Sequence, residues 1–393
     1  MRLLILSPTL PVPPLDGTTT YLHNILGDLA QEAEITVAAH RGTPGAPALM
    51  RQYFGSGVES HVYGSEGLRR FRYRGYVSLS PKTLAVDEHF VAWVLELAAK
   101  RQYQGVLVCG SMLASFVEVF RPTLPAMYLP LDATARNLFA LARFHAVPVR
   151  WIIRFLALKW IWYEKRIVKL AAASIFVSAH DKEYVVGRKG NESCHIVPNG
   201  VDKRVFHPMP AVPKEFDLVV GGNFEYGPNA DGLCCFIDLM RQPALQSHAW
   251  RSLLCGRRCA PSIQRRLQQM SGITCSWDVP DMAAAVQRAR LFVSPVRYGS
   301  GIRNNVIQAL ACGMPVISDP INVEALSGQE GKHYVCYRTK EEFAVMAQHL
   351  LNDPSAQERL GANGLEYVDT CHDWHLVART ILGLVHKSCR RVH

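Results

Sequence analysis

The chain has 393 residues, of which 49% are apolar and 19% are charged, and its formal net charge is +10. This length exceeds one ordinary hydrophobic core, so two domains of roughly 150–200 residues each are expected. The apolar fraction excludes a disordered chain. The positive charge favours an anionic partner: a nucleotide-sugar, nucleic acid or an anionic membrane surface. Nucleic acid is the weakest of these, because no zinc-finger spacing or aromatic RNA-binding motif accompanies the charge.

The eleven cysteines are scattered, without CxxC pairs or histidines at zinc-ligand spacing. This pattern favours reduced core thiols in a cytosolic protein over disulfides. The first residues, MRLLILSPTLP, look like a β-strand and lack the features of a signal peptide. No uninterrupted apolar run reaches the ~20 residues of a membrane-spanning helix.

Strand-like and helix-like runs alternate through the first half of the chain, which predicts a parallel sheet covered by helices. The expected elements are a helix over 18–30 and strands over 3–7, 35–39, 106–109, 126–129 and 174–177. Ligands on such sheets gather at the carboxyl ends of the strands.

The loop after the first strand, PTLPVPPLDGTTTYLHNIL, leaves the strand through prolines and reaches Gly17. Gly17 permits close backbone approach, and Thr18 or Thr19 can hydrogen-bond a phosphate or a sugar. Taken alone, these residues favour a plain loop with a threonine helix cap over a ligand-binding loop.

Asp132, in MYLPLDATARN, follows directly after a predicted strand. A carboxylate at a strand end can orient an acceptor hydroxyl or accept its proton. An aspartate that caps the following helix is an equally good interpretation.

The segment 150–170, RWIIRFLALKWIWYEKRIVKL, predicts an amphipathic helix. Its apolar face collects Ile152, Ile153, Leu156, Trp160, Tyr163, Ile167 and Leu170. Basic residues spread over the other side, together with Trp151 and Trp162. Mixed aromatic and cationic side chains suit a membrane interface. A buried helix with a solvated face is the alternative, and it is slightly favoured.

The segment 197–213, VPNGVDKRVFHPMPAVP, has four prolines and little periodicity, so it is the best linker in the chain. A second alternation follows it, with strands expected over 216–220, 252–255, 291–294 and 315–318 and a terminal helix around 374–387. The expected domains are 1–200 and 201–370, followed by a crossover helix and basic tail over 371–393.

The segment 294–319, SPVRYGSGIRNNVIQALACGMPVISD, reads as a buried strand, a glycine-rich turn, a helix and a second strand. Gly299 and Gly301 free the turn backbone, so that N–H groups can approach a ligand at the start of the helix. Such a site suits a phosphate or diphosphate, and Arg297 and Arg303 would add charge. Alternatively, Arg297 pairs with a nearby carboxylate.

This segment resembles the nucleotide-sugar signature of retaining GT-B glycosyltransferases, especially family 4. The runs YEKRIVKLAAASIFVSAHDKEYV, HIVPNGVD and GGNFEYGPNADGLCCF resemble a subgroup of that family associated with bacterial exopolysaccharide biosynthesis. The resemblance spans residues 3–374. It implies a GT-B fold of two Rossmann-like βαβ domains facing across a cleft, the first for the acceptor and the second for the donor. It also implies that the C-terminal helix crosses back to the N-terminal domain.

The resemblance favours the ligand-binding interpretation of the first loop and assigns roles to individual residues. Asp132 and Arg297 are expected to be catalytic. The residues expected to bind the donor or its diphosphate are Gly17, Thr18, Gly222, Asn223, Arg297, Gly299, Ser300, Gly301, Ile302, Arg303, Asn305 and Gln308.

Several positions depart from the family pattern. Typical members carry Arg and Lys in a GR…KG pattern, where this chain has Asn223 and later Asn229. Other cations must therefore neutralise the negative charge of the diphosphate. Asn305 stands for a lysine, Gln308 for a ribose-binding glutamate and Ser300 for an acidic residue. A glutamine keeps a carbonyl acceptor but loses the charge.

Together these features predict a retaining, metal-independent glycosyltransferase that moves a sugar from a nucleoside diphosphate-sugar to a hydroxyl of a glycan, lipid-linked or small-molecule acceptor. No cofactor, metal or nucleic acid is expected. The protein is expected in the cytoplasm in polysaccharide biosynthesis, with 150–170 as the segment for peripheral contact with the inner face of the membrane. Two alternatives stay open: a catalytically degenerate protein that binds a glycan or partner enzyme, and, less favoured, a nucleotide-sugar epimerase.

Overall fold

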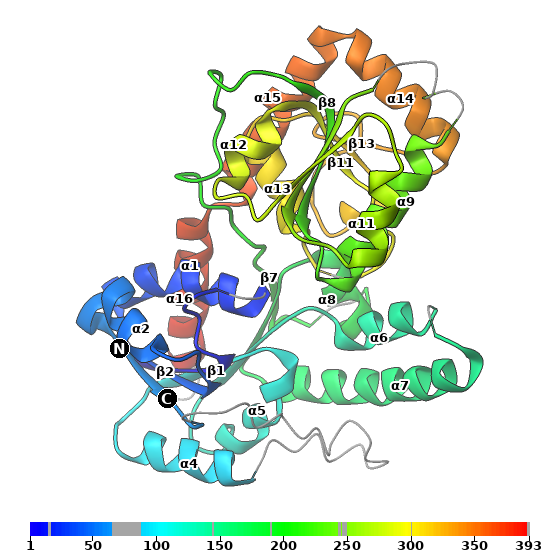
Figure 1. Cartoon of the computed structure of the whole chain (residues 1–393). Coiled ribbons are helices and arrows are strands. Elements are labelled where there is room, and N and C mark those ends of the chain that lie inside the picture. The colour runs from blue at the N-terminus through cyan, green and yellow to red at the C-terminus, as the bar shows by residue number, and fades with distance from the viewer. Residues whose placement is uncertain are drawn as a thin grey trace. The chain divides into compact units, whose positions relative to one another are not determined.

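The computed structural model describes residues 1–14, 17–64, 88–143, 145–188, 191–242, 245, 250–299 and 301–390. The chain divides into two compact units (Figure 1). Unit 1 comprises Met1–Asn199 and Trp374–His393, and unit 2 comprises Gly200–Asp373.

Unit 1 is built on a seven-stranded parallel sheet in the order β3-β2-β1-β4-β5-β6-β7. Its strands are β1 (Arg2–Thr9), β2 (Glu34–Arg41), β3 (Val58–Val62), β4 (Gly105–Cys109), β5 (Ala126–Leu131), β6 (Ala173–Phe176) and β7 (Cys194–Ile196). Its helices include α1 (Gly17–Glu32), α2 (Ala46–Phe54), α4 (Glu88–Ala99), α5 (Ser115–Phe120), α6 (Thr134–Ala142), α7 (Val147–Leu170) and α8 (Ala179–Val186). The central strands β4 and β5 are buried along their whole length, as expected for a sheet covered on both faces.

The last helix of the chain, α16 (Trp374–Arg390), belongs to unit 1 and packs along α1 (Figure 1). The buried Trp374 ring meets Tyr21 edge to face at 5.2 Å between ring centroids. On the surface, His375 Nδ1 lies 2.7 Å from a carboxylate oxygen of Asp28. The chain therefore returns to its first domain, as predicted.

Unit 2 is a second parallel sheet, in the order β10-β9-β8-β11-β12-β13. Its strands are β8 (Phe216–Asn223), β9 (Ser252–Arg257), β10 (Ile273–Trp277), β11 (Ala289–Ser294), β12 (Val316–Ser318) and β13 (Val335–Cys336). Its helices include α9 (Gly227–Met240), α11 (Pro261–Gln268), α12 (Met282–Gln287), α13 (Asn304–Ala311), α14 (Lys340–Asn352) and α15 (Pro354–Cys371).

The GT-B fold prediction is confirmed, since both halves are parallel βαβ sheets and α16 returns to the first. The strands that the sequence pattern did not predict are β3, β7, β10 and β13, and each of them lies at an edge of its sheet. These strands are short and half-buried or exposed over most of their residues. An edge strand needs little apolar sequence, because one side of it faces no further strand.

The helix predicted over 150–170 is α7, which starts earlier, at Val147. Trp160, Tyr163 and Ile167 form its buried face, as predicted. Ile152, predicted on the same face, is 61% exposed, so this face is not buried along the whole helix. Among the described residues, no helix combines the length and apolar character needed to cross a membrane.

Candidate nucleotide-sugar site

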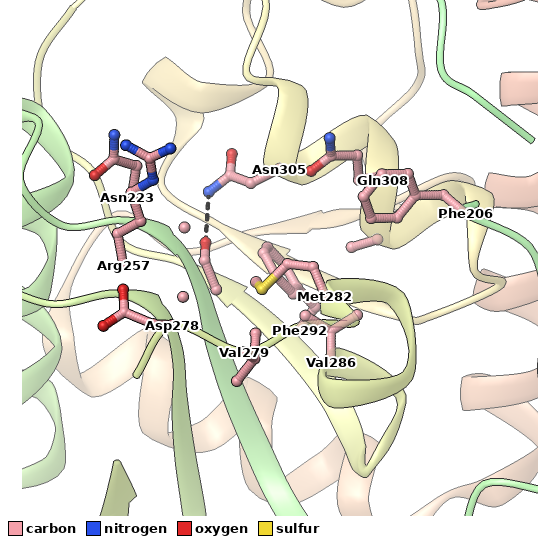
Figure 2. A pocket seen from close by; sticks show the side chains of 14 residues that line it. Phe206, Asn223, Arg257, Asp278, Val279, Met282, Val286, Phe292, Asn305 and Gln308 are labelled. Carbon is pink, nitrogen blue, oxygen red and sulfur yellow. Dashed lines mark hydrogen bonds between the residues drawn. The ribbon is translucent and has the colours of Figure 1, made fainter. Parts of the chain in front are cut away.

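Unit 2 contains a pocket of about 400 Å³ at the carboxyl ends of its central strands (Figure 2). The end of β8 and the end of β9 form its floor, and α12 and α13 contribute side chains from their first and second turns. Its lining residues are Phe206, Gly221, Gly222, Asn223, Gly256, Arg257, Asp278, Val279, Met282, Val286, Phe292, Asn305, Gln308 and Ala309. This is the edge at which parallel α/β sheets bind ligands.

The floor of the pocket depends on glycines in neighbouring strands. Gly222 pairs with Gly256 in the β8–β9 register, and Gly256 has a φ of +135°. A Cβ atom on Gly256 would collide with the carbonyl oxygen of Gly222. The two strand ends therefore approach closely with bare backbone, which leaves peptide groups exposed to a ligand.

The glycine-rich turn predicted before α13 has positive φ angles at both of its glycines. Gly299 has a φ of +123° and Gly301 a φ of +73°, conformations that side-chain-bearing residues rarely adopt. Ser300, predicted as part of this turn, lies outside the described residues, and Ile302 is buried beside the turn. The turn sets the N-terminus of α13 at the pocket, where its N–H groups favour an anion.

Arg303 packs against this turn and is hydrogen-bonded to it. Its Nη2 donates a hydrogen bond to the backbone oxygen of Tyr298 at 2.7 Å, and the residue is only 8% exposed. A Cβ on Gly299 would collide with the Arg303 guanidinium, so the glycine makes room for the arginine. Arg303 is not among the residues that line the pocket. Its clearest contribution is therefore to hold the turn.

Arg297 is bound by a carboxylate. Its Nε and Nη2 donate to the two carboxylate oxygens of Asp231, on α9, at 3.0 and 2.6 Å. These hydrogen bonds raise the pKa of Arg297 above its usual value, so the guanidinium stays charged. The carboxylate pairing considered from the sequence is thus present, and Arg297 does not line the pocket.

Asn305 connects α13 to the floor of the pocket. Its Nδ2 donates to the carbonyl oxygen of Gly221 at 3.1 Å, the hydrogen bond drawn in Figure 2. Gln308, one turn further along α13, also lines the pocket. The neutral amide of Asn305 can link α13 to β8 by this hydrogen bond. It supplies no positive charge to a phosphate.

Several pocket residues were not selected from the sequence. Arg257, at the end of β9, places a cationic side chain at the pocket, 4.0 Å from Glu225. Asp278 follows β10 with a φ of +54°, and Phe206 comes from the segment before β8. Arg257 ends one strand of the parallel sheet and Asp278 follows another, and a position at the carboxyl end of a strand was the sequence signal that could have identified them. Phe206 had no local signal, because only the fold brings it to the pocket.

The predicted site residues Gly17, Thr18 and Asp132 lie in unit 1. Gly17 is the first residue of α1, so Thr18 lies in its first turn. Asp132 follows β5 and is half-buried, and the preceding Leu131 has a φ of +69°. A left-handed leucine is strained, which is common where a loop is held in one conformation.

The helix after Asp132 is anchored by a buried carboxylate. Glu164, on α7, accepts a hydrogen bond from the backbone N–H of Thr134 at 2.7 Å and is 2% exposed. Burial raises the pKa of Glu164 to about 7. Nearby, Arg136 pairs with the buried Asp181 at 3.3 Å. These contacts hold the first turn of α6, which begins two residues after Asp132.

In the part of the chain that the structure describes, no group of three or more His, Cys, Asp or Glu side chains is arranged to hold a metal ion.

Comparison with known proteins agrees with this geometry. Residues 215–353 match the family model for glycosyl transferases group 1, a span that includes β8 to β13 and every pocket-lining residue except Phe206. The whole fold resembles sucrose-phosphate synthase from Thermosynechococcus elongatus, with a TM-score of 0.73, 16% identity and 98% of each chain covered.

Two further solved structures have the same fold. One is HepE from Anabaena in complex with UDP-glucose, with a TM-score of 0.68, 13% identity, and coverage of 98% of this chain and 100% of that chain. The other is WaaG, a glycosyltransferase involved in lipopolysaccharide biosynthesis, with a TM-score of 0.67, 13% identity, and coverage of 98% and 99%. The group 1 match in unit 2 supports a glycosyltransferase, and the two-sheet fold of the whole chain is the GT-B fold.

Proposed function

We propose that the protein is a retaining, metal-independent glycosyltransferase of family 4, in the subgroup associated with bacterial exopolysaccharide biosynthesis. It would move a sugar from a nucleoside diphosphate-sugar to a hydroxyl of a glycan, lipid-linked or small-molecule acceptor. The observation that carries the proposal is the unit 2 pocket, where the bare backbone of Gly222 and Gly256 meets the N-terminus of α13 inside the group 1 domain. The structure of HepE with UDP-glucose makes that compound the first donor to test.

The pocket offers complementary surfaces to the parts of such a donor. Peptide N–H groups and a helix N-terminus suit the diphosphate. Gln308 keeps an amide oxygen that can accept a hydrogen bond from a ribose hydroxyl, as the resemblance implies for this position. Phe206, Met282 and Phe292 line the pocket with apolar surface for the uncharged parts of the donor.

Two cations are assigned to the diphosphate, Arg297 and Arg257. The Asp231 ion pair uses two of the five N–H donors of the Arg297 guanidinium, and the side chain remains 47% exposed. The pair would therefore orient Arg297 without consuming its capacity to bind phosphate oxygens. Arg257 already lines the pocket and is 61% exposed.

In the proposed reaction the bond between the sugar and the diphosphate breaks as the acceptor hydroxyl attacks from the same face. The departing phosphate takes up the negative charge and accepts the hydroxyl proton, so its stabilisation is the main catalytic contribution. Arg297 would provide that stabilisation. Asp132, in unit 1, would orient the acceptor hydroxyl. Gly17 and Thr18, at the start of α1, would allow the loop after β1 to approach the substrates closely.

We further propose that the protein acts in the cytoplasm, in polysaccharide biosynthesis, at the inner face of the membrane. The segment 150–170 would supply the peripheral contact. A lipid-linked acceptor fits this location best among the three acceptor classes.

One observation favours a second candidate, a catalytically degenerate protein that binds a glycan or a partner. Asn305 replaces a lysine, and its amide nitrogen is bonded to the Gly221 carbonyl instead of facing a phosphate. A site that has lost its phosphate lysine could retain the fold and the pocket while losing transfer.

Calorimetry with UDP-, GDP- and dTDP-sugars, followed by assays of donor hydrolysis with and without EDTA, separates these candidates. The transferase is expected to bind at least one donor and to hydrolyse it slowly in both conditions. Arg297→Ala should abolish turnover and weaken diphosphate binding. Arg338→Ala is the matched control, because Arg338 makes the same two-point ion pair with Glu330 away from the pocket. Donor binding without turnover favours the degenerate protein, and no binding to any donor refutes both.

A further inference from the structure

Helix α7 has two apolar faces, and unit 1 uses only one of them. Trp160, Tyr163 and Ile167 point into the core and are at most 3% exposed. Figure 1 shows α7 as a long helix beside α6, with which it packs. A helix that needed only to cover the core would carry polar residues on its outer side.

The outer side instead carries four large apolar residues in one line, which we call the α7 stripe. Trp151, Phe155, Leu158 and Trp162 are 61%, 51%, 54% and 77% exposed. They follow one another at intervals of four, three and four residues, which places them on one face of the helix. Exposed large apolar residues are ordinary when they are scattered, but a contiguous row of them marks an interaction surface.

Basic side chains surround and extend the stripe. Lys165 and Lys169 continue the same interval of three and four residues beyond Trp162, and both are exposed. Near the other end, the Arg154 guanidinium lies 5.3 Å from the centre of the Trp151 ring. The single acidic residue of α7 is Glu164, which is buried against α6 and contributes no negative charge to this face.

This distribution of charge decides between two occupants. A second copy of the chain would bring Lys165 and Lys169 against another cationic helix face, with no exposed carboxylate on α7 to pair with them. Anionic lipid headgroups complement the lysines, and tryptophan and phenylalanine rings insert favourably at the boundary between headgroups and acyl chains. Each lysine or arginine near such a surface adds about 1 kcal/mol of attraction.

We propose that the α7 stripe, with Lys165 and Lys169, docks unit 1 on an anionic membrane surface. The helix would lie in the plane of the surface, with its aromatic rings among the headgroups and its lysines on the phosphates. This deepens the proposed inner-face location by naming the surface and the lipid charge that it recognises.

The test is flotation of the full chain with vesicles of phosphatidylcholine alone or of an equimolar mixture with phosphatidylglycerol. We expect strong binding to the mixed vesicles, weakened by added salt, and little binding to phosphatidylcholine alone. Trp151→Ser/Trp162→Ser should weaken binding at least about tenfold. Val345→Ser, which removes another exposed apolar side chain from unit 2, should leave binding unchanged.

Lys165→Gln/Lys169→Gln should also weaken binding to the mixed vesicles about tenfold or more. Lys340→Gln, an exposed lysine on α14, is its control. Equal binding to both vesicle types, no binding to either, or insensitivity to the stripe variants would overturn the proposal. So would a dimer in sedimentation velocity that Trp151→Ser/Trp162→Ser dissociates, because the stripe would then bind a second copy.

The vesicle assay stands apart from the donor assay. The stripe variants should bind UDP-glucose as the unaltered protein does, since the pocket lies wholly in unit 2. A failure of donor binding with intact vesicle binding would therefore count against the proposed transferase and leave the docking surface standing.

Discussion

Replacing the buried Glu164 by glutamine should change how stability depends on pH. In the folded protein, burial raises the pKa of Glu164 to about 7, against an ordinary value of about 4.5. Between these pH values the folded state keeps a proton that the unfolded state has released. The free energy of unfolding therefore falls as the pH rises through this window. A shift of this size corresponds to a loss on the order of 3 kcal/mol.

Glutamine has the same shape and keeps an oxygen that can accept the Thr134 N–H, but it does not ionise in this range. Relative to the unaltered protein, Glu164→Gln should therefore become more stable as the pH rises from about 5 to 8, by up to about 3 kcal/mol. Glu164→Ala should instead be destabilised at both ends of this pH range, because the half-buried Thr134 N–H loses its acceptor at a cost of about 1–3 kcal/mol.

Urea unfolding followed by tryptophan fluorescence at several pH values measures the difference directly. Glu183→Gln provides a control, because this glutamate of α8 is 53% exposed on the surface of the same unit. Parallel pH profiles for the unaltered protein and Glu164→Gln would refute the reasoning. A difference that grows toward low pH would do so as well.

Three further changes probe the fold and the site. Gly256→Ala should destabilise unit 2 by more than about 4 kcal/mol and abolish nucleotide binding, because its Cβ would meet the Gly222 carbonyl; a normal melting temperature would contradict this packing. Gly27→Ala, in α1, meets no atom within 4 Å and should stabilise unit 1 by about 1 kcal/mol in urea unfolding; a loss of stability would speak against open space at this position. Arg257→Ala should weaken UDP-glucose binding roughly tenfold or more by calorimetry, without unfolding unit 2; unchanged affinity would remove Arg257 from the site.

The interior strands of both sheets could be read from the sequence, and the edge strands could not. Interior strands such as β4 and β8 are covered on both faces and flanked by strands on both sides, so they appear as continuous apolar runs. The edge strand β10 is largely exposed or half-buried along ITCSW, and β13 has only two residues. Such segments become strands because a neighbour offers hydrogen-bond partners, and that neighbour is distant in sequence.

The predicted site divides in a similar way. The glycine-rich turn at Gly299 and Gly301 was predicted from the sequence, because glycines in a turn indicate a local backbone requirement. The partner of Arg297 was not, since Asp231 lies 66 residues away on α9. Arg257 lies at the pocket because the strand order of the sheet places the end of β9 beside the end of β8. No local sequence pattern specifies that order.

The sequence by itself determined the two βαβ halves, the glycine turn and the amphipathic character of α7. These depend on periodicity and on backbone requirements within a few residues. Only the tertiary structure decided that Arg297 forms an ion pair with Asp231 and that Arg303 packs against the glycine turn. It also decided that one apolar face of α7 stays exposed. Whether a side chain is buried, paired or available depends on elements far along the chain, and folding alone brings these together.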